Sequence, residues 1–192
     1  MNLSASVASR DDAVLVVIDV QERLAATMSR RDTVVRMTHK LMRTAALVGV
    51  PVIVTRQYPA GLGDVEPGLR LIAEEIGEAT SVAWADKVAF DCFAEPSFVE
   101  ALAAQGRTQL IIAGMESHIC VVQTALSALD DEFDVHVVSD ACCSRDGASH
   151  ETALARLAAA GATVTTTESV LYELVGVAGT DEFRSLLRIV KE

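Results

Sequence analysis

Three side chains with different chemistry stand at or just beyond the ends of short apolar segments. Asp19 ends the run AVLVVID, Lys87 follows a weaker apolar segment at 81–85, and Cys120 lies a few residues beyond the apolar segment 109–113. When such segments are parallel strands, the residues at their carboxyl ends meet at one edge of the sheet. A thiol at that edge can attack a carbonyl carbon, a carboxylate can take the thiol proton, and an ammonium group can stabilise negative charge.

The position of Cys120 is the most informative of the three. With Ser117 as the N-cap of a helix that begins after the tripeptide GME, Cys120 is the third helical residue. The unpaired N–H groups and positive dipole of a first helical turn favour an anion, which predicts a lowered pKa for the thiol and a site for an oxyanion. The alternative interpretation is a small buried apolar residue.

Each of the other candidates also has a structural alternative. Asp19 can serve as the N-cap of a helix over 20–26, and Lys87 alone can be a solvated surface residue. Cys142 and Cys143 follow another apolar segment and compete with Cys120 for the role of nucleophile, although no comparable helix start follows them.

The apolar pattern predicts a three-layer α/β/α sandwich with a mostly parallel sheet of about six strands. Strands that are apolar on both faces suit a sheet covered by helices on both sides, and alternating strands and helices indicate right-handed βαβ units. The expected strands are 13–19, 51–55, 81–85, 109–113, 134–138 and 162–166. The expected longer helices are 33–48, 96–105, 117–129, 149–160, 168–175 and 180–190. No linker or repeat divides the chain, so we expect a single domain over 1–192.

Charge and apolar content exclude several classes of partner. The chain of 192 residues carries 16 Lys and Arg against 27 Asp and Glu, a net charge of −11, which disfavours nucleic acid and anionic membrane surfaces. Its apolar runs are too short to span a membrane, and no secretory signal is visible. The four cysteines are interpreted as reduced thiols, so we expect a cytoplasmic protein.

The sequence gives no sign of a metal or cofactor. Its four histidines are scattered and never pair with each other or with a cysteine at ligand spacing. No glycine fingerprint opens a dinucleotide-binding helix, and no phosphate-binding loop motif occurs. We therefore predict no metal site and no cofactor.

Three motifs occur together in one order and spacing. They are VVIDVQ at 16–21, Lys87 followed by VAFDCF at 88–93, and GMESHICVVQTA at 114–125. This combination resembles the isochorismatase-like cysteine hydrolases, a family that includes nicotinamidases, N-carbamoylsarcosine amidohydrolases and true isochorismatases. The resemblance extends over 12–175, nearly the whole chain.

The resemblance implies a catalytic triad of Asp19, Lys87 and Cys120. It also implies a cis peptide between Met115 and Glu116, with the N–H groups of Glu116 and Cys120 turned towards an oxyanion. The implied chemistry is covalent: Asp19 takes the thiol proton, the thiolate attacks an amide-like carbonyl, and water later hydrolyses the thioester.

Departures from the family pattern narrow the range of activities that the resemblance implies. The segment TRQYPAGLG at 55–63 lacks the histidine of the nicotinamidase metal motif, and Cys120 argues against vinyl-ether hydrolysis because true isochorismatases generally lack it. Asp91 stands where many relatives carry serine. With SDACCSRD at 139–146 and TTESVLYELVG at 166–176, the chain is most similar to the isochorismatase-domain-containing branch.

The leading hypothesis is a metal-independent hydrolase of a C–N bond in a small molecule. The alternatives are a vinyl-ether hydrolase and a non-catalytic binding or scaffold homologue. Family analogy also implies a homo-oligomer, a dimer or larger. The residues expected to line the substrate pocket are Gln21, Tyr58, Trp84, Phe90, His118 and Ile119.

Overall fold

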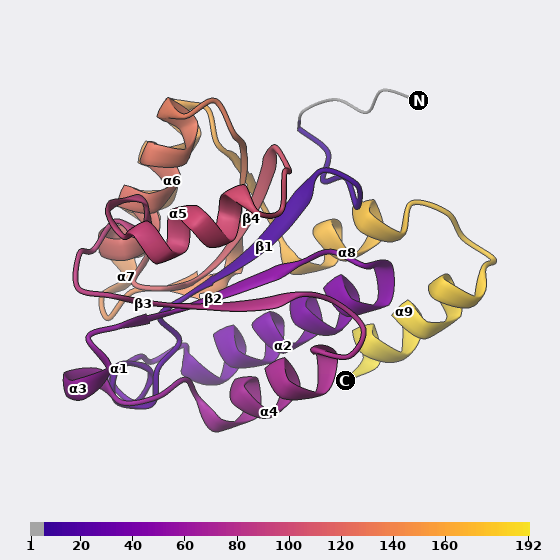
Figure 1. Cartoon of the computed structure of the whole chain (residues 1–192), viewed down its shortest axis with the longest axis horizontal. Helices are drawn as coiled ribbons and strands as arrows, with labels where there is room; N and C mark the ends of the chain where they lie inside the picture. The colour runs from indigo at the N-terminus through magenta and orange to yellow at the C-terminus, as the bar shows by residue number, and fades with distance from the viewer. Residues whose placement is uncertain (1–5) are drawn as a thin grey trace.

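A six-stranded parallel sheet forms the centre of the computed structural model, which describes residues 6–192 (Figure 1). The strand order is β3-β2-β1-β4-β5-β6, and every neighbouring pair is parallel. The strands are β1 (Ala13–Ile18), β2 (Val52–Gln57), β3 (Val82–Lys87), β4 (Gln109–Met115), β5 (Asp134–Cys143) and β6 (Thr163–Thr165). The expected parallel sheet is confirmed, and within the described residues it contains no antiparallel strand.

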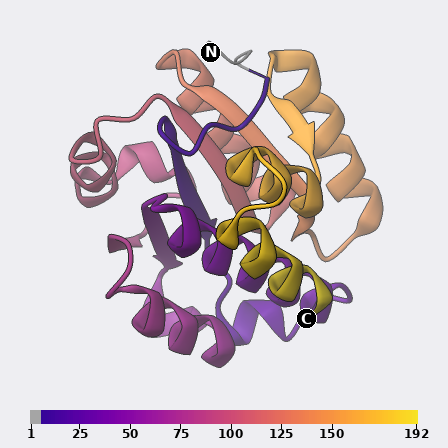
Figure 2. The ribbon, with the colours of Figure 1, turned by 90° about the vertical axis from the view of Figure 1, so that its right-hand side faces the viewer.

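Helices cover both faces of this sheet, as the predicted three-layer architecture requires. One face carries α2 (Arg31–Val48), α4 (Pro67–Ile76), α8 (Thr167–Val175) and α9 (Asp181–Lys191). The other carries α5 (Pro96–Ala103), α6 (Val122–Asp130) and α7 (Gly147–Ala160). Short helical turns are α1 (Glu22–Ala25), α3 (Pro59–Leu62), η1 (Cys92–Ala94) and the π-helical turn η2 (Ser117–Val121). Figure 2 shows α8 and α9 packed side by side.

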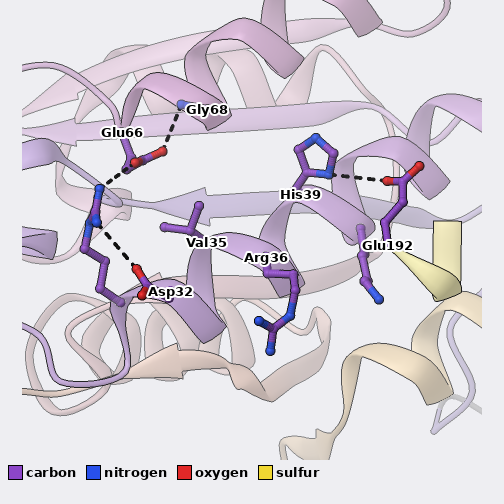
Figure 3. A pocket seen from close by; sticks show the side chains of 9 residues that line it. Asp32, Val35, Arg36, His39, Glu66, Gly68 and Glu192 are labelled. Carbon is purple, nitrogen blue, oxygen red and sulfur yellow. Dashed lines mark hydrogen bonds and ion pairs between the residues drawn. The ribbon is translucent and has the colours of Figure 1, made fainter.

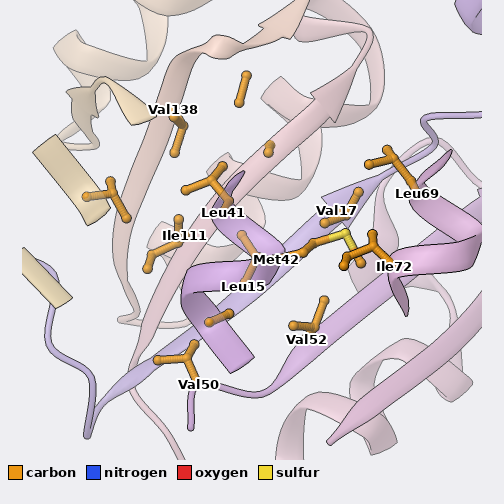
Figure 4. Close-up of a cluster of buried hydrophobic side chains, with 14 of the residues drawn as sticks. Leu15, Val17, Leu41, Met42, Val50, Val52, Leu69, Ile72, Ile111 and Val138 are labelled. Atoms are coloured by element: carbon orange, nitrogen blue, oxygen red, sulfur yellow. The ribbon is translucent and has the colours of Figure 1, made fainter. Parts of the chain in front are cut away.

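The core is divided into two halves by the sheet because successive strand residues point to opposite faces. In β1, Leu15 and Val17 face the half formed with α2, where they lie with Leu41 (Figure 4). Val14 and Val16 of the same strand face the half formed with α5 and α6. All six β1 side chains are buried, which explains the lack of polar alternation in its sequence.

Two elements differ from the sequence-based expectation. Helix α4 was not among the expected helices; Glu66 caps it by accepting a hydrogen bond from the Gly68 N–H, and Pro67 occupies its first turn. Strand β5 runs to Cys143 instead of ending at 138; its pairing with β4 shifts register after Val137 and continues at Cys142. The two adjacent cysteines therefore lie inside a buried strand and not beyond its end.

Gly114 allows β4 to pass close to the end of β1. Its φ is +132°, and a Cβ added there would lie 2.0 Å from the carbonyl oxygen of Ile18. We predict that Gly114→Ala lowers the free energy of unfolding by roughly 2–3 kcal/mol, because it combines backbone strain with overpacking. Urea denaturation measures this loss. Gly147→Ala is the control, since nothing lies within 4 Å of the added Cβ, and equal losses in both variants would contradict the explanation.

Two further expectations concern membrane spans and the number of domains. No helix within 6–192 combines the length and apolar character needed to cross a membrane. The single-domain assignment over 1–192 stays a prediction, and residues 1–5 lie outside the described residues.

Candidate active site

A buried ion pair lies where the order of the strands reverses direction. β1 is flanked by β2 and β4, and in open parallel sheets this switch point is where ligands bind. Asp19 follows β1 with a left-handed φ of 52°, a conformation that aspartate tolerates better than most residues. Its Oδ2 lies 2.7 Å from Nζ of Lys87, the last residue of β3, and neither side chain is exposed.

Two residues of β2 hold this pair from one side. The Thr55 hydroxyl donates to Oδ1 of Asp19 at 2.7 Å, and Lys87 Nζ donates to Oε1 of Gln57 at 2.6 Å. The alternative interpretations of the pair are wrong: Lys87 is buried and not a surface residue, and the Asp19 carboxylate caps no helix, because α1 begins after Gln21 without a side-chain cap.

Cys120 lies close enough to the ion pair that the charges of both Asp19 and Lys87 act on its thiol. It occupies the first turn after β4 and is 5% exposed. Burial and the charge of Asp19 raise the pKa of its thiol to about 12, and Lys87 opposes this shift. The expected lowering of the pKa is therefore wrong, because desolvation of the thiolate outweighs any stabilisation of the anion by the first helical turn. The thiol is protonated at neutral pH and needs a base.

The high thiol pKa predicts a slow and steeply pH-dependent alkylation of Cys120. Below the pKa, the thiolate fraction rises about tenfold per pH unit, and the rate of reaction with iodoacetamide rises with it. We expect this slope from pH 7 to pH 10, measured by mass spectrometry of the Cys120 peptide. A rate that levels off below pH 9 would show that the thiol is already ionised there.

The peptide between Met115 and Glu116, at the end of β4, is cis. The Glu116 carboxylate is buried and accepts hydrogen bonds from the backbone N–H of Arg145 at 2.9 Å and from its Nε at 3.2 Å. This contact joins the start of η2 to the connection between β5 and α7.

The next two residues of the turn make further contacts with the same connection and α7. Ser117 Oγ lies 2.8 Å from Nδ1 of His150, and His118 Nδ1 lies 2.9 Å from Ser144 Oγ. Ser117 is thus not the predicted N-cap, since its hydroxyl is engaged with His150 and the turn begins without a side-chain cap. These contacts fix the turn that carries Cys120.

Two of the residues expected to bind substrate have other positions. Gln21 is fully buried, and its amide bonds the backbone of Gln57 and the Gly63 carbonyl. Trp84 lies against the α2–α4 half of the core with the Arg70 guanidinium 4.8 Å from its ring centroid. Ala85, the next residue, packs in the other half of the core, so Trp84 faces away from the ion pair.

The remaining four expected pocket residues lie on the loops at the same edge. Tyr58 and Phe90 are more than half exposed, and their backbones bond Lys87: the Tyr58 N–H donates to its carbonyl, and the Phe90 carbonyl accepts from Nζ at 3.3 Å. His118 is exposed and Ile119 is half-buried, and both belong to the η2 turn that holds Cys120. Their contact with substrate stays a prediction.

Other polar groups near the cluster have structural partners. Asp91 accepts hydrogen bonds from the Phe93 N–H and from the Ser127 hydroxyl, which fixes η1 against α6. Cys92 is fully buried near the ion pair, with its N–H donating to Thr124 Oγ1. Within the described part of the chain, no group of three or more His, Cys, Asp or Glu is placed to hold a metal ion.

The sequence interpretation missed Thr55 and Gln57. They lie two and four residues after Ile53 in β2, and Ile53 packs in the α5–α6 half of the core. The two-residue period of a strand places all three side chains on one face, the face on which Lys87 and Ala85 lie. The two-residue period of β2 was therefore the signal from which Thr55 and Gln57 could have been predicted to lie near Lys87.

A hollow of about 330 Å³ lies elsewhere, on the outer side of α2 near the C-terminus (Figure 3). It contains none of the ion-pair residues or Cys120. Several of its polar groups are already paired: Arg31 bonds Glu66 and Asp32, and His39 lies 4.0 Å from Glu192. We therefore place the candidate active site at the sheet edge.

The fold and the position of the cluster define a doubly wound α/β protein with a buried polar site at its switch point. A family model for the Isochorismatase domain matches residues 13–169. The chain belongs to the isochorismatase family, which makes it a hydrolase by family.

Individual relatives agree with this assignment. The secreted isochorismatase effector Isc1 of Phytophthora sojae is 36% identical over 94% of this chain and 85% of its own. Isochorismatase domain-containing protein 2 of Bos taurus is 32% identical over 94% and 83%. The YcaC gene product of Escherichia coli, described as an octameric hydrolase of unknown specificity, superimposes with a TM-score of 0.85 at 26% identity, covering 95% and 90% of the chains.

Proposed function

We propose that this protein is a metal-independent cysteine hydrolase that cleaves an amide-like C–N bond of a small molecule. The observation that carries the proposal is the buried Asp19–Lys87 ion pair, whose two charges act on the buried Cys120 thiol. A protonated thiol next to a carboxylate supplies a nucleophile with its own base. The buried ammonium supplies a fixed positive charge for the negative charge that develops.

The reaction proceeds in two halves. Asp19 takes the proton of Cys120 as sulfur bonds to the carbonyl carbon; the C–N bond then breaks, and Asp19 returns the proton to the departing nitrogen. Asp19 next deprotonates a water molecule, which attacks the thioester carbon; the C–S bond breaks, and sulfur regains a proton. The N–H groups of Glu116 and Cys120 bind the oxyanion in both halves.

A screen of small amides, ureas and carbamoyl compounds for release of ammonia or amine tests this proposal. Acid quenching during turnover, followed by peptide mass spectrometry, should place the acyl group on Cys120. Cys92→Ala is the matched control, because Cys92 is a second buried thiol near the same ion pair, and it should leave the adduct unchanged. Turnover with no Cys120 adduct, persisting when Cys120 is replaced, would instead favour vinyl-ether or other thiol-independent chemistry.

We infer that the protein forms a homo-oligomer, a dimer or larger. The octameric YcaC relative supports this inference, as do exposed apolar side chains on three separate segments: Leu71, Val88 and Val177 are 67%, 74% and 65% exposed. Light scattering coupled to size-exclusion chromatography measures the mass in solution. A monomer of 20.4 kDa at micromolar concentration would contradict it.

We also propose a cytoplasmic location and a substrate other than nucleic acid. The four cysteines are all unpaired in the structure, which fits a reducing compartment. The net charge of −11 repels phosphate backbones. Fractionation with a fluorescent fusion tests the location.

A further inference from the structure

The Gln57 side chain connects the ammonium of Lys87 to the loop that follows it. Its Oε1 accepts from Lys87 Nζ at 2.6 Å, and its Nε2 donates to the Val88 carbonyl at 2.6 Å. Both ends of one amide thus bind neighbouring residues, one at the charged atom and one at the backbone. Gln57 is 8% exposed, so little water competes for these bonds.

Gln21, which lies between β1 and α1, holds the backbone of Gln57. The Gln57 N–H donates to Gln21 Oε1 at 2.7 Å, and Gln21 Nε2 donates to the Gln57 carbonyl at 3.1 Å. The same nitrogen donates to the Gly63 carbonyl at 2.8 Å, so both of its protons are used. Because Gln21 is fully buried, this contact fixes the end of β2 relative to Asp19 two residues earlier.

The Lys87 ammonium has more acceptors around it than N–H groups. It has three N–H donors, and its closest contacts are the hydrogen bond to Gln57 Oε1 at 2.6 Å and the ion pair with Asp19 Oδ2 at 2.7 Å. The carbonyls of Ala89 and Phe90 accept from Nζ at 3.3 Å, and the charge of the ammonium acts on the Cys120 thiol. The position of the ammonium therefore depends on which of these contacts are present.

We infer that Gln57 is a positioning residue that fixes the Lys87 ammonium where its charge stabilises the Cys120 thiolate. The inference rests on the proposed function and adds to it a residue that touches neither sulfur nor substrate. Without the Gln57 oxygen, the ammonium loses its shortest contact and shifts towards the Ala89 and Phe90 carbonyls. The thiolate then loses part of its electrostatic stabilisation.

Gln57→Met tests this role, because methionine has similar length and no oxygen. The pH profile of the reaction of Cys120 with iodoacetamide, measured between pH 7 and pH 10, should shift to higher pH by about one unit. The reaction is then about tenfold slower at each pH. On a substrate from the amide screen, kcat should fall on the order of tenfold to a hundredfold with KM nearly unchanged.

Gln109→Met is the matched control. Gln109 is also a buried strand glutamine with a doubly bonded amide, accepting from the Ser9 N–H at 2.8 Å and donating to the Val7 carbonyl at 3.2 Å. It begins β4, at the other end of the sheet. If Gln57 had only a structural role, loss of its hydrogen bonds should lower the stability of both variants. The pH dependence of Cys120 alkylation should then stay unchanged in both.

Superimposable alkylation profiles for Gln57→Met and the unaltered protein would overturn the inference. If Gln57→Met fails to fold, Gln57→Asn replaces it, since its amide is one methylene too short to reach Nζ, and the same displacement is expected. Alkylation needs no turnover, so failure of the inference can be told from failure of the proposed function. Failure of the proposed function would show as hydrolysis that survives Cys120→Ala, whatever the pH profile of alkylation.

Discussion

Alanine in place of Cys120 is expected to abolish turnover while leaving the fold intact. Without sulfur no thioester forms, and removing the nucleophile of a covalent hydrolase typically costs about 10⁴-fold or more in kcat. The stability loss should be about 1 kcal/mol, the usual size for a single substitution, because only one buried atom is removed and the ion pair stays closed. Turnover of a substrate from the amide screen and the urea midpoint measure the two quantities.

Cys92→Ala separates loss of the nucleophile from loss of any buried thiol. Burial raises the pKa of Cys92 to about 12, as it does for Cys120, and both thiols lie in the field of the same ion pair. Cys92 belongs to η1, and only Cys120 follows β4 at the switch point. Turnover should survive Cys92→Ala within a few-fold. Retention of more than about one hundredth of activity in Cys120→Ala would exclude the covalent mechanism.

The sheet could be predicted from sequence because its strands are buried on both faces. Apolar runs without alternation require cover on both sides, and the strand-end rule then places Asp19, Lys87 and Cys120 among the candidates at one edge. The resemblance to the family was needed to single these three out from competitors such as Cys142 and Cys143. The pKa of Cys120 could not be predicted in this way. It depends on how deeply the loops bury the thiol, and that burial comes from contacts distant in sequence, such as Ser117 with His150.

The pocket residues show where sequence proximity misleads. Trp84 lies near Lys87 in sequence, but an odd number of residues along a strand places the two side chains on opposite faces. Gln21 lies two residues after Asp19, and it is turned inward to hold Gln57. Strand parity explains the first error, whereas the second depends on the backbone turn at Asp19 and the close approach of β2.

Removal of Lys87 should produce the largest loss of stability. Lys87→Met leaves the Asp19 carboxylate buried with no opposite charge, and breaking a buried ion pair on one side typically costs about 3–5 kcal/mol. Urea denaturation at pH 7 measures the difference. Arg184→Met is the control: Arg184 pairs with Asp181 on an exposed surface, where its side chain is 63% exposed, and the loss should stay below about 1 kcal/mol.

Two further measurements test whether the unpaired charge causes this loss. Adding Asp19→Asn to Lys87→Met removes the remaining charge and should restore most of the lost free energy. Burial disfavours the Lys87 ammonium, but Asp19 together with the nearby Cys92 and Cys120 outweighs burial, and the pKa of Lys87 is raised above its ordinary value of 10.5. A raised pKa stabilises the fold below about pH 10.5 and loses this effect as pH rises through the folded pKa. The difference between the unaltered protein and Lys87→Met should therefore be constant from pH 7 to pH 9 and shrink above about pH 10.5. A double variant as unstable as Lys87→Met would instead assign the loss to the packing of the lysine stem.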